Sequence, residues 1–83
     1  MYKRFDSIEE LVDNISRGGE IEFEYQGENY SITQPKGEIN IMKFYDYSTL
    51  KTYQCPWDVV DYEIENSKIE MIIKDIVVKF RCF

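Results

Sequence analysis

The segment that decides the fold is Glu20-Ile-Glu-Phe-Glu-Tyr-Gln-Gly-Glu-Asn-Tyr-Ser-Ile-Thr33. Apolar and polar residues alternate along both of its halves, and a Gly interrupts them in the middle. This period of two is typical of an antiparallel β-hairpin that buries one face and exposes the other. The segment therefore predicts two neighbouring strands with an apolar inner face and an acidic outer face.

The turn of this hairpin must fall between Tyr25 and Tyr30. If Gly27 and Glu28 are the two loop residues, Gly27 supplies the positive φ that a type II′ turn requires at its first central position. Tyr25 then lies opposite Tyr30. A slip of one residue would place apolar side chains opposite polar ones, so the face that each side chain occupies is strongly specified.

The chain has 83 residues, which is the size of one small domain. It shows neither a secretory signal pattern nor a run of apolar residues long enough to span a membrane, and we expect it to stay in the cytoplasm. There is no histidine, which excludes catalytic and metal sites that depend on imidazole. Cys55 and Cys82 lack the spacing of a zinc site or a disulfide scaffold, and we expect two reduced, packed thiols and no cofactor.

The net charge is −6 at neutral pH, and most of the negative charge lies in the first two thirds of the chain. Negative surfaces repel phosphate groups, so direct binding of nucleic acid is not expected. A protein partner with a basic surface would instead be attracted. The charge therefore favours a protein interaction over contact with nucleic acid or a membrane.

The remaining segments predict an α+β fold in the order α-β-β-β-(β)-α-α-β. Its sheet has four to five strands, antiparallel or mixed, with an N-terminal and a C-terminal helix packed on one face. A helix begins after the cap Ser7 and ends at Gly18 and Gly19. The next element is a strand from Ile39, with a bulge near residue 42 or with both faces covered there. The later elements are a turn at 46–49, a strand at 50–54, a helical turn or two at 55–61, a helix at 68–75 and a closing strand at 77–82.

Several packing and turn residues also form a pattern that resembles a known group of proteins. The pattern comprises Phe5, Ser7, Glu10, Leu11 and Ile15, the hairpin residues from Gly18 to Ile32, and Trp57, Asp58, Val59, Val60, Tyr62, Ile64, Lys68 and Ile69. It resembles small uncharacterised proteins of low-GC Gram-positive bacteria, their phages and mobile elements. The resemblance implies a fold and a genomic setting, and it carries over no catalytic residue.

Three carboxylates, those of Glu20, Glu22 and Glu24, are expected on one face of the first hairpin strand. Alternate residues of a strand lie about 6.6 Å apart, so the three would form a short negative ladder. One interpretation is a contact for a basic partner, with carboxylates in place of phosphates. The other is a solvated face that is balanced by Lys79 and Arg81, if the last strand lies beside the first.

Aromatic residues are concentrated between residues 44 and 62. We expect Phe44 and Trp57 in the core, because a small domain needs large side chains to fill it. Tyr45, Tyr47 and Tyr53, with Asp46 among them, are instead candidates for a binding surface, since tyrosine supplies rigid contact area with a polar tip. The alternative for these tyrosines is also the core.

The acidic residues Asp58, Asp61, Glu63 and Glu65 lack the loop pattern of a calcium site, so no metal site is predicted. No arrangement of residues indicates a catalytic site, and the chain is expected not to be an enzyme. The sequence favours an acidic protein-interaction module, in its most specific form a phage or mobile-element accessory protein or inhibitor of the anti-CRISPR type. A self-associating structural domain or subunit, with a homodimer as its simplest form, is the alternative.

Overall fold

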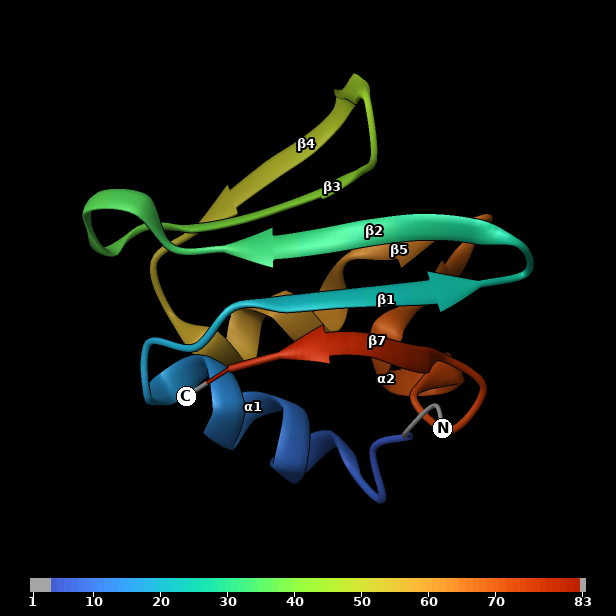
Figure 1. Cartoon of the computed structure of the whole chain (residues 1–83), viewed down its shortest axis with the longest axis horizontal. Helices are drawn as coiled ribbons and strands as arrows, with labels where there is room; N and C mark the ends of the chain where they lie inside the picture. Colours follow the sequence, from blue (N-terminus) through green and yellow to red (C-terminus); the bar gives the residue numbers. More distant parts are fainter. Residues whose placement is uncertain (1–3, 83) are drawn as a thin grey trace.

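The computed structural model describes residues 4–82, and within them the chain forms an α+β fold, as predicted. A five-stranded antiparallel sheet has the order β4-β3-β2-β1-β7, and a second, two-stranded sheet pairs β5 with β6 (Figure 1). The elements are α1 (Ile8–Ser16), β1 (Ile21–Tyr25), β2 (Glu28–Thr33), η1 (Pro35–Gly37), β3 (Ile39–Lys43), β4 (Asp46–Tyr53), η2 (Pro56–Asp61), β5 (Glu63–Ile64), β6 (Ser67–Lys68), α2 (Ile69–Ile72) and β7 (Val77–Arg81).

One face of the large sheet is covered and the other is open. Side chains from alternate strand positions are buried together with residues of α1, η2 and α2 in one core. The buried set includes Leu11, Ile15, Ile21, Phe23, Ile32, Ile41, Val59, Ile69, Ile76 and Val78. We call the covered side of the sheet the inner face and the open side the outer face. No helix among the described residues is long and apolar enough to cross a membrane.

Helix α1 begins where the sequence predicted. Ser7 caps it, its hydroxyl accepting a hydrogen bond from the Glu10 backbone N–H at 3.3 Å, while the Glu10 carboxylate accepts one from the backbone N–H of Asp6 at 3.0 Å. The Ser7 contact satisfies a backbone donor that the first turn of a helix leaves without a partner, and the Glu10 contact holds the residue before the cap. At the other end Gly18 adopts a positive φ of 80° and stops the helix.

The β1–β2 hairpin forms, but its predicted register is wrong by two residues. Gln26 and Gly27 occupy the loop with φ of 51° and 82°, so both central residues are left-handed, as in a type I′ turn. Phe23 therefore faces Tyr30, and their rings stack with centroids 5.3 Å apart. A shift of two residues keeps each side chain on its face, so the predicted inner and outer faces are correct.

The predicted irregularity in β3 is present, because the pairing of β3 with β4 shifts between Ile41 and Lys43. The predicted turn at residues 46–49 is wrong. Phe44 and Tyr45 form the connection instead, and Tyr45 takes a left-handed φ of 63°. Strand β4 therefore starts at Asp46, four residues earlier than expected.

The closing strand β7 lies beside β1, and a β-bulge changes which of its side chains face outward. Glu22 pairs with Phe80 and Phe23 pairs with Val78, so Lys79 is an extra residue between them. The bulge therefore places Phe80 on the outer face, where it is exposed, whereas Val78 is buried on the inner face. Beyond the bulge Arg81 turns toward α1.

The segment after β4 differs most from the prediction. It begins with the 3-10 helix η2, whose repeat of three residues buries Val59 and Tyr62. Trp57 is 51% exposed, so its predicted place in the core is wrong. The helix expected at 68–75 is reduced to α2, and residues 63–68 form the small β5–β6 hairpin. Ile69, Ile72, Ile73 and Ile76 are buried.

The cysteines also differ from the prediction. Both are reduced, but Cys55 and Cys82 are exposed and not packed in the core. The Cys82 sulfur accepts a hydrogen bond from the backbone N–H of Glu20 at 3.4 Å. This contact helps to hold the end of β7 beside the start of β1.

Candidate functional site

The acidic residues of β1 do not form a uniform ladder. Glu24 is paired, with its Oε1 atom 3.1 Å from the Nζ atom of Lys79. Glu22 is exposed on the outer face, and it forms no ion pair with another residue of the described range 4–82. Glu20 precedes β1 and is also exposed. Glu22 is therefore the acidic residue of β1 that is best placed to contact another molecule on the outer face.

Arg81 is not beside Glu22, contrary to one interpretation of the sequence. Its guanidinium Nε donates to the Asn14 side-chain oxygen at 2.8 Å and lies 4.9 Å from the centre of the Phe5 ring. One of its terminal nitrogens lies 4.0 Å from the Glu10 carboxylate. The bulge at Lys79 is the cause, because it rotates the following residues by one position. Of the two cations expected to balance the acidic strand, Lys79 pairs with Glu24, whereas the Arg81 side chain contacts Asn14 of α1.

Tyr45 and Tyr47 project from the β3–β4 hairpin, and they are 94% and 78% exposed. Tyr45 is exposed because it occupies the tight connection between the strands, and Tyr47 follows it at the start of the edge strand β4. Rings this exposed gain nothing from the core, so their apolar area is available to another molecule.

Asp46 and Tyr53 lie apart from these two tyrosines. The Asp46 carboxylate accepts hydrogen bonds from the Ser48 hydroxyl at 2.5 Å and the Ser48 backbone N–H at 3.1 Å, and the hydroxyl bond is the main reason that its pKa is lowered. Tyr53 pairs with Ile39 at the far end of β4 and packs against the core, and burial raises its pKa. Neither residue lies on the surface that Tyr45 and Tyr47 share.

A groove of about 330 Å³ on the outer face joins residues that the sequence analysis treated separately. It extends across four strands and places Glu22 of β1 on the same concave surface as Tyr45 and Tyr47. The groove is lined by Glu22, Ser31, Thr33, Met42, Phe44, Tyr45 and Tyr47. We call this surface the outer groove.

Met42 and Phe44 were not predicted for this surface. Phe44 was expected in the core, but it is only partly buried and lies in the outer groove. The alternation contained the signal, because Ile39 and Ile41 face the core and the even-numbered positions that follow, 42 and 44, then fall on the outer face. Phe80, which lies opposite Glu22 in the β1–β7 pair, adds a further exposed aromatic ring to the outer face.

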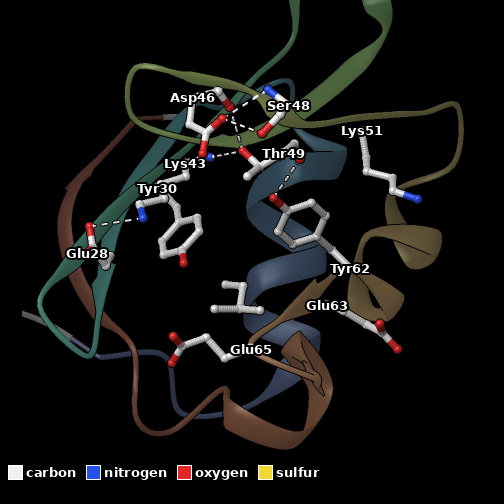
Figure 2. A pocket seen from close by; sticks show the side chains of 11 residues that line it. Glu28, Tyr30, Lys43, Asp46, Ser48, Thr49, Lys51, Tyr62, Glu63 and Glu65 are labelled. Carbon is white, nitrogen blue, oxygen red and sulfur yellow. Dashed lines mark hydrogen bonds and ion pairs between the residues drawn. The ribbon is translucent and has the colours of Figure 1, made fainter.

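A second hollow, of about 420 Å³, opens on the inner side of the sheet. It lies between strands β2, β3 and β4 and the segment from η2 to β5, and Tyr30 and Tyr62 form part of its wall (Figure 2). The Tyr62 hydroxyl donates to the Thr49 carbonyl oxygen at 2.8 Å, and Lys43 Nζ lies 3.4 Å from Glu28 Oε2. Burial is the main cause that raises the pKa of both tyrosines. We call this hollow the inner pocket.

The acidic residues near the C-terminal helices are dispersed. Asp61 forms an ion pair with Lys68 at 3.4 Å, and Glu63 and Glu65 line the inner pocket. Among residues 4–82 no group of three or more carboxylate or thiolate side chains is arranged to hold a metal ion.

Comparison with family models, with curated proteins and with solved structures finds no match for this chain. The functional argument therefore depends on the geometry of the two concave surfaces.

Proposed function

We propose that the chain is a non-enzymatic protein-interaction module whose outer groove binds a basic segment of a partner protein. The observation that carries the proposal is that Glu22, Tyr45 and Tyr47 line one groove. A carboxylate beside two exposed aromatic rings suits a lysine or arginine side chain, which gains a charge contact and a cation–π contact together. Exposed Met42 and Phe44 atoms supply apolar area around these polar contacts.

The charge of the whole chain supports the same class of partner. At a net charge of −6 the protein attracts a basic surface from a distance and speeds its approach. The most specific form of the proposal is an inhibitor or accessory protein that covers the basic surface of a nucleic-acid-handling protein, as anti-CRISPR proteins do. Neutralisation of Glu24 by Lys79 makes Glu22 the main acidic contact in this form.

The test is affinity capture from native cell lysate with wild-type protein and with a variant that carries Glu22→Lys, Tyr45→Ser and Tyr47→Ser. We expect wild type to retain a basic protein, with retention that weakens as salt rises because ion pairs are screened. The variant is expected to lose it, and a Glu9→Lys variant, altered on the exposed side of α1, is expected to keep it. Retention by all three proteins, or retention that salt does not affect, would contradict the proposal.

Self-association is a second candidate, and the edge strand β4 favours it. β4 has eight residues and forms the border of the sheet, so one side of its backbone has no neighbouring strand within the sheet. Exposed edges of this kind pair readily with a second copy of the same strand. Sedimentation would distinguish the two candidates, because a monomer has a mass of 10.0 kDa and a β4-paired dimer has twice that mass.

A further inference from the structure

The inner pocket contains a polar group that the fold itself does not use. Tyr30 is 6% exposed, and its ring is fixed by stacking on Phe23. Among residues 4–82 the structure gives its hydroxyl no hydrogen-bond partner, and no polar atom that is completely buried lacks one. The Tyr30 hydroxyl therefore reaches the open space of the pocket. Figure 2 shows it directed into that space, whereas the neighbouring Tyr62 hydroxyl is bonded to Thr49.

The charges around this hydroxyl favour a cation. Four carboxylates and two ammonium groups line the pocket, and one of the ammonium groups, that of Lys43, already pairs with Glu28. The other belongs to Lys51, which Figure 2 shows pointing away from Tyr30. The Glu65 carboxylate faces the same open space as the Tyr30 hydroxyl. After these pairings, Glu65 is the charged group best placed to contact a ligand at Tyr30.

The pocket also has a suitable size and composition. Its volume of about 420 Å³ lies within the range of small-molecule sites, which is roughly 300 to 1,000 Å³. The rings of Tyr30 and Tyr62 and the side chain of Ile64 supply apolar and aromatic wall. Aromatic walls combined with a carboxylate are a recurring arrangement for binding organic cations.

We propose that the inner pocket binds a small organic cation, an alkylammonium or alkylguanidinium group, with the Tyr30 hydroxyl accepting a hydrogen bond from its N–H and Glu65 supplying the opposite charge. The same chemistry is present in a free amine and in the lysine or arginine side chain of a peptide. The inner pocket and the outer groove lie on opposite faces of the sheet and share no lining residue. The two proposals can therefore fail separately.

The test is a titration of the full chain, followed by the ¹H–¹⁵N shifts of its backbone amides. The probes are n-butylguanidinium, n-butylammonium and n-butyrate, which carry short alkyl chains of three or four carbons and differ in the charged group. We expect saturable shifts from the two cations at the amides of Tyr30, Ile64 and Glu65, and no such shifts from butyrate. A peptide with one arginine, acetyl-Gly-Arg-Gly-amide, is titrated in parallel. Tighter binding of the small cations than of the peptide identifies a free amine or guanidine as the natural ligand, and tighter binding of the peptide identifies a peptide side chain.

The variants that decide the case are Tyr30→Phe and Glu65→Gln. Tyr30→Phe keeps the stacked ring and removes only the hydroxyl, so we expect it to weaken cation binding about 3- to 10-fold, the equivalent of one ordinary hydrogen bond. Glu65→Gln lies at an exposed turn and is expected to weaken it by a similar factor. Tyr25→Phe is the matched control, because the Tyr25 hydroxyl contacts Gln26 outside the pocket and its removal is expected to leave binding unchanged.

Three results would overturn the proposal. They are the absence of saturable shifts at the pocket amides, equal binding of butyrate, and unchanged affinity in both pocket variants. The amide spectrum of each variant reports whether it is folded, and Glu65→Gln alone decides the result if Tyr30→Phe does not fold.

Discussion

Asn14 and Arg81 join the first helix to the last strand: the Arg81 Nε donates to the Asn14 side-chain oxygen at 2.8 Å. The Asn14 amide nitrogen in turn donates to the Cys82 carbonyl oxygen at 3.1 Å. Asn14 is fully buried, and it is the one buried polar residue among residues 4–82. Because it satisfies groups on both sides, it fixes where β7 ends against α1.

Replacement of Asn14 by Ala is therefore expected to lower the free energy of unfolding by about 2 to 4 kcal/mol, since it removes two hydrogen bonds from a buried position, one with the partly buried Arg81 guanidinium and one with the Cys82 carbonyl oxygen. Urea denaturation measures this change. The matched control is Asp13→Ala, which removes an exposed ion pair with Arg17 at 3.2 Å and is expected to cost about 0.5 kcal/mol. Equal costs for the two variants would show that Asn14 does not tie the helix to the strand.

Gly19 lies between the end of α1 and the residue that follows β7, where a side chain has no room. A Cβ atom at this position would meet the Cys82 carbonyl oxygen and would lie 2.5 Å from the Asn14 amide nitrogen. Gly19→Ala must therefore move backbone, and we expect a loss of about 3 kcal/mol or more. Gly18→Ala is the control, because a Cβ there meets nothing within 4 Å and adds only the strain of a left-handed φ, about 1 to 2 kcal/mol. Thermal unfolding of the two variants measures the difference, and a larger loss at Gly18 would be incompatible with the close approach.

Stability is expected to fall at high pH because three phenols have raised pKa values in the folded chain. Burial is the largest cause for Tyr30, Tyr53 and Tyr62, whose ordinary pKa is 10.0. Above that pH the unfolded chain releases phenolic protons that the folded chain still holds, so its ionisation favours unfolding. The stabilisation that the protonated phenols supply is fully present below pH 10. It is lost as the pH rises through the raised pKa values that these phenols have in the folded chain.

The measurement is the urea midpoint of wild type and of a Tyr30→Phe, Tyr53→Phe, Tyr62→Phe variant at pH 9 and at pH 11. Wild type is expected to lose more stability between the two values than the variant, by up to about 1.4 kcal/mol per pH unit for each phenol. The same loss in both proteins would mean that these phenols titrate alike in the folded and unfolded chains.

The sequence determined which residues face the core more reliably than where the strands bend. The period of two in β1 and β2 identified both faces of the hairpin, because any slip that preserves burial must be by two residues. It could not select the turn, since a type II′ turn with Gly27 first and a type I′ turn with Gly27 second both satisfy that pattern. The structure uses the second, and Gln26 accepts the left-handed conformation.

The sequence pattern could not predict the bulge at Lys79 or the 3-10 helix η2, for a related reason. Both change the local period, so Phe80 and Trp57 occupy exposed positions that an uninterrupted strand and an α-helix would have buried. The groove itself could not be predicted, because Glu22 and Tyr47 are 25 positions apart and meet only through the order of strands β1 to β4.

The ion pair between Glu24 and Lys79 is expected to contribute little to stability, because both side chains are about one third exposed. Glu24→Gln should lower the free energy of unfolding by no more than about 1 kcal/mol, and less at high salt. Glu22→Gln should leave it unchanged or raise it slightly, since Glu22 forms no ion pair within the part of the chain that the structure describes. Chemical denaturation at two salt concentrations measures both, and a larger cost for Glu22→Gln would assign a structural role to the residue that we place in the outer groove.

Site-specific photocrosslinking in native cells tests the outer groove most directly. A benzoylphenylalanine placed at Tyr47 in the groove is compared with one placed at Met71, an exposed residue of α2 in the helical layer. The account predicts that the Tyr47 probe forms a covalent adduct with a basic protein, that Glu22→Lys abolishes the adduct, and that the Met71 probe forms none. Adduct formation from Met71 but not from Tyr47, or adducts that persist in the Glu22→Lys variant, would contradict the account.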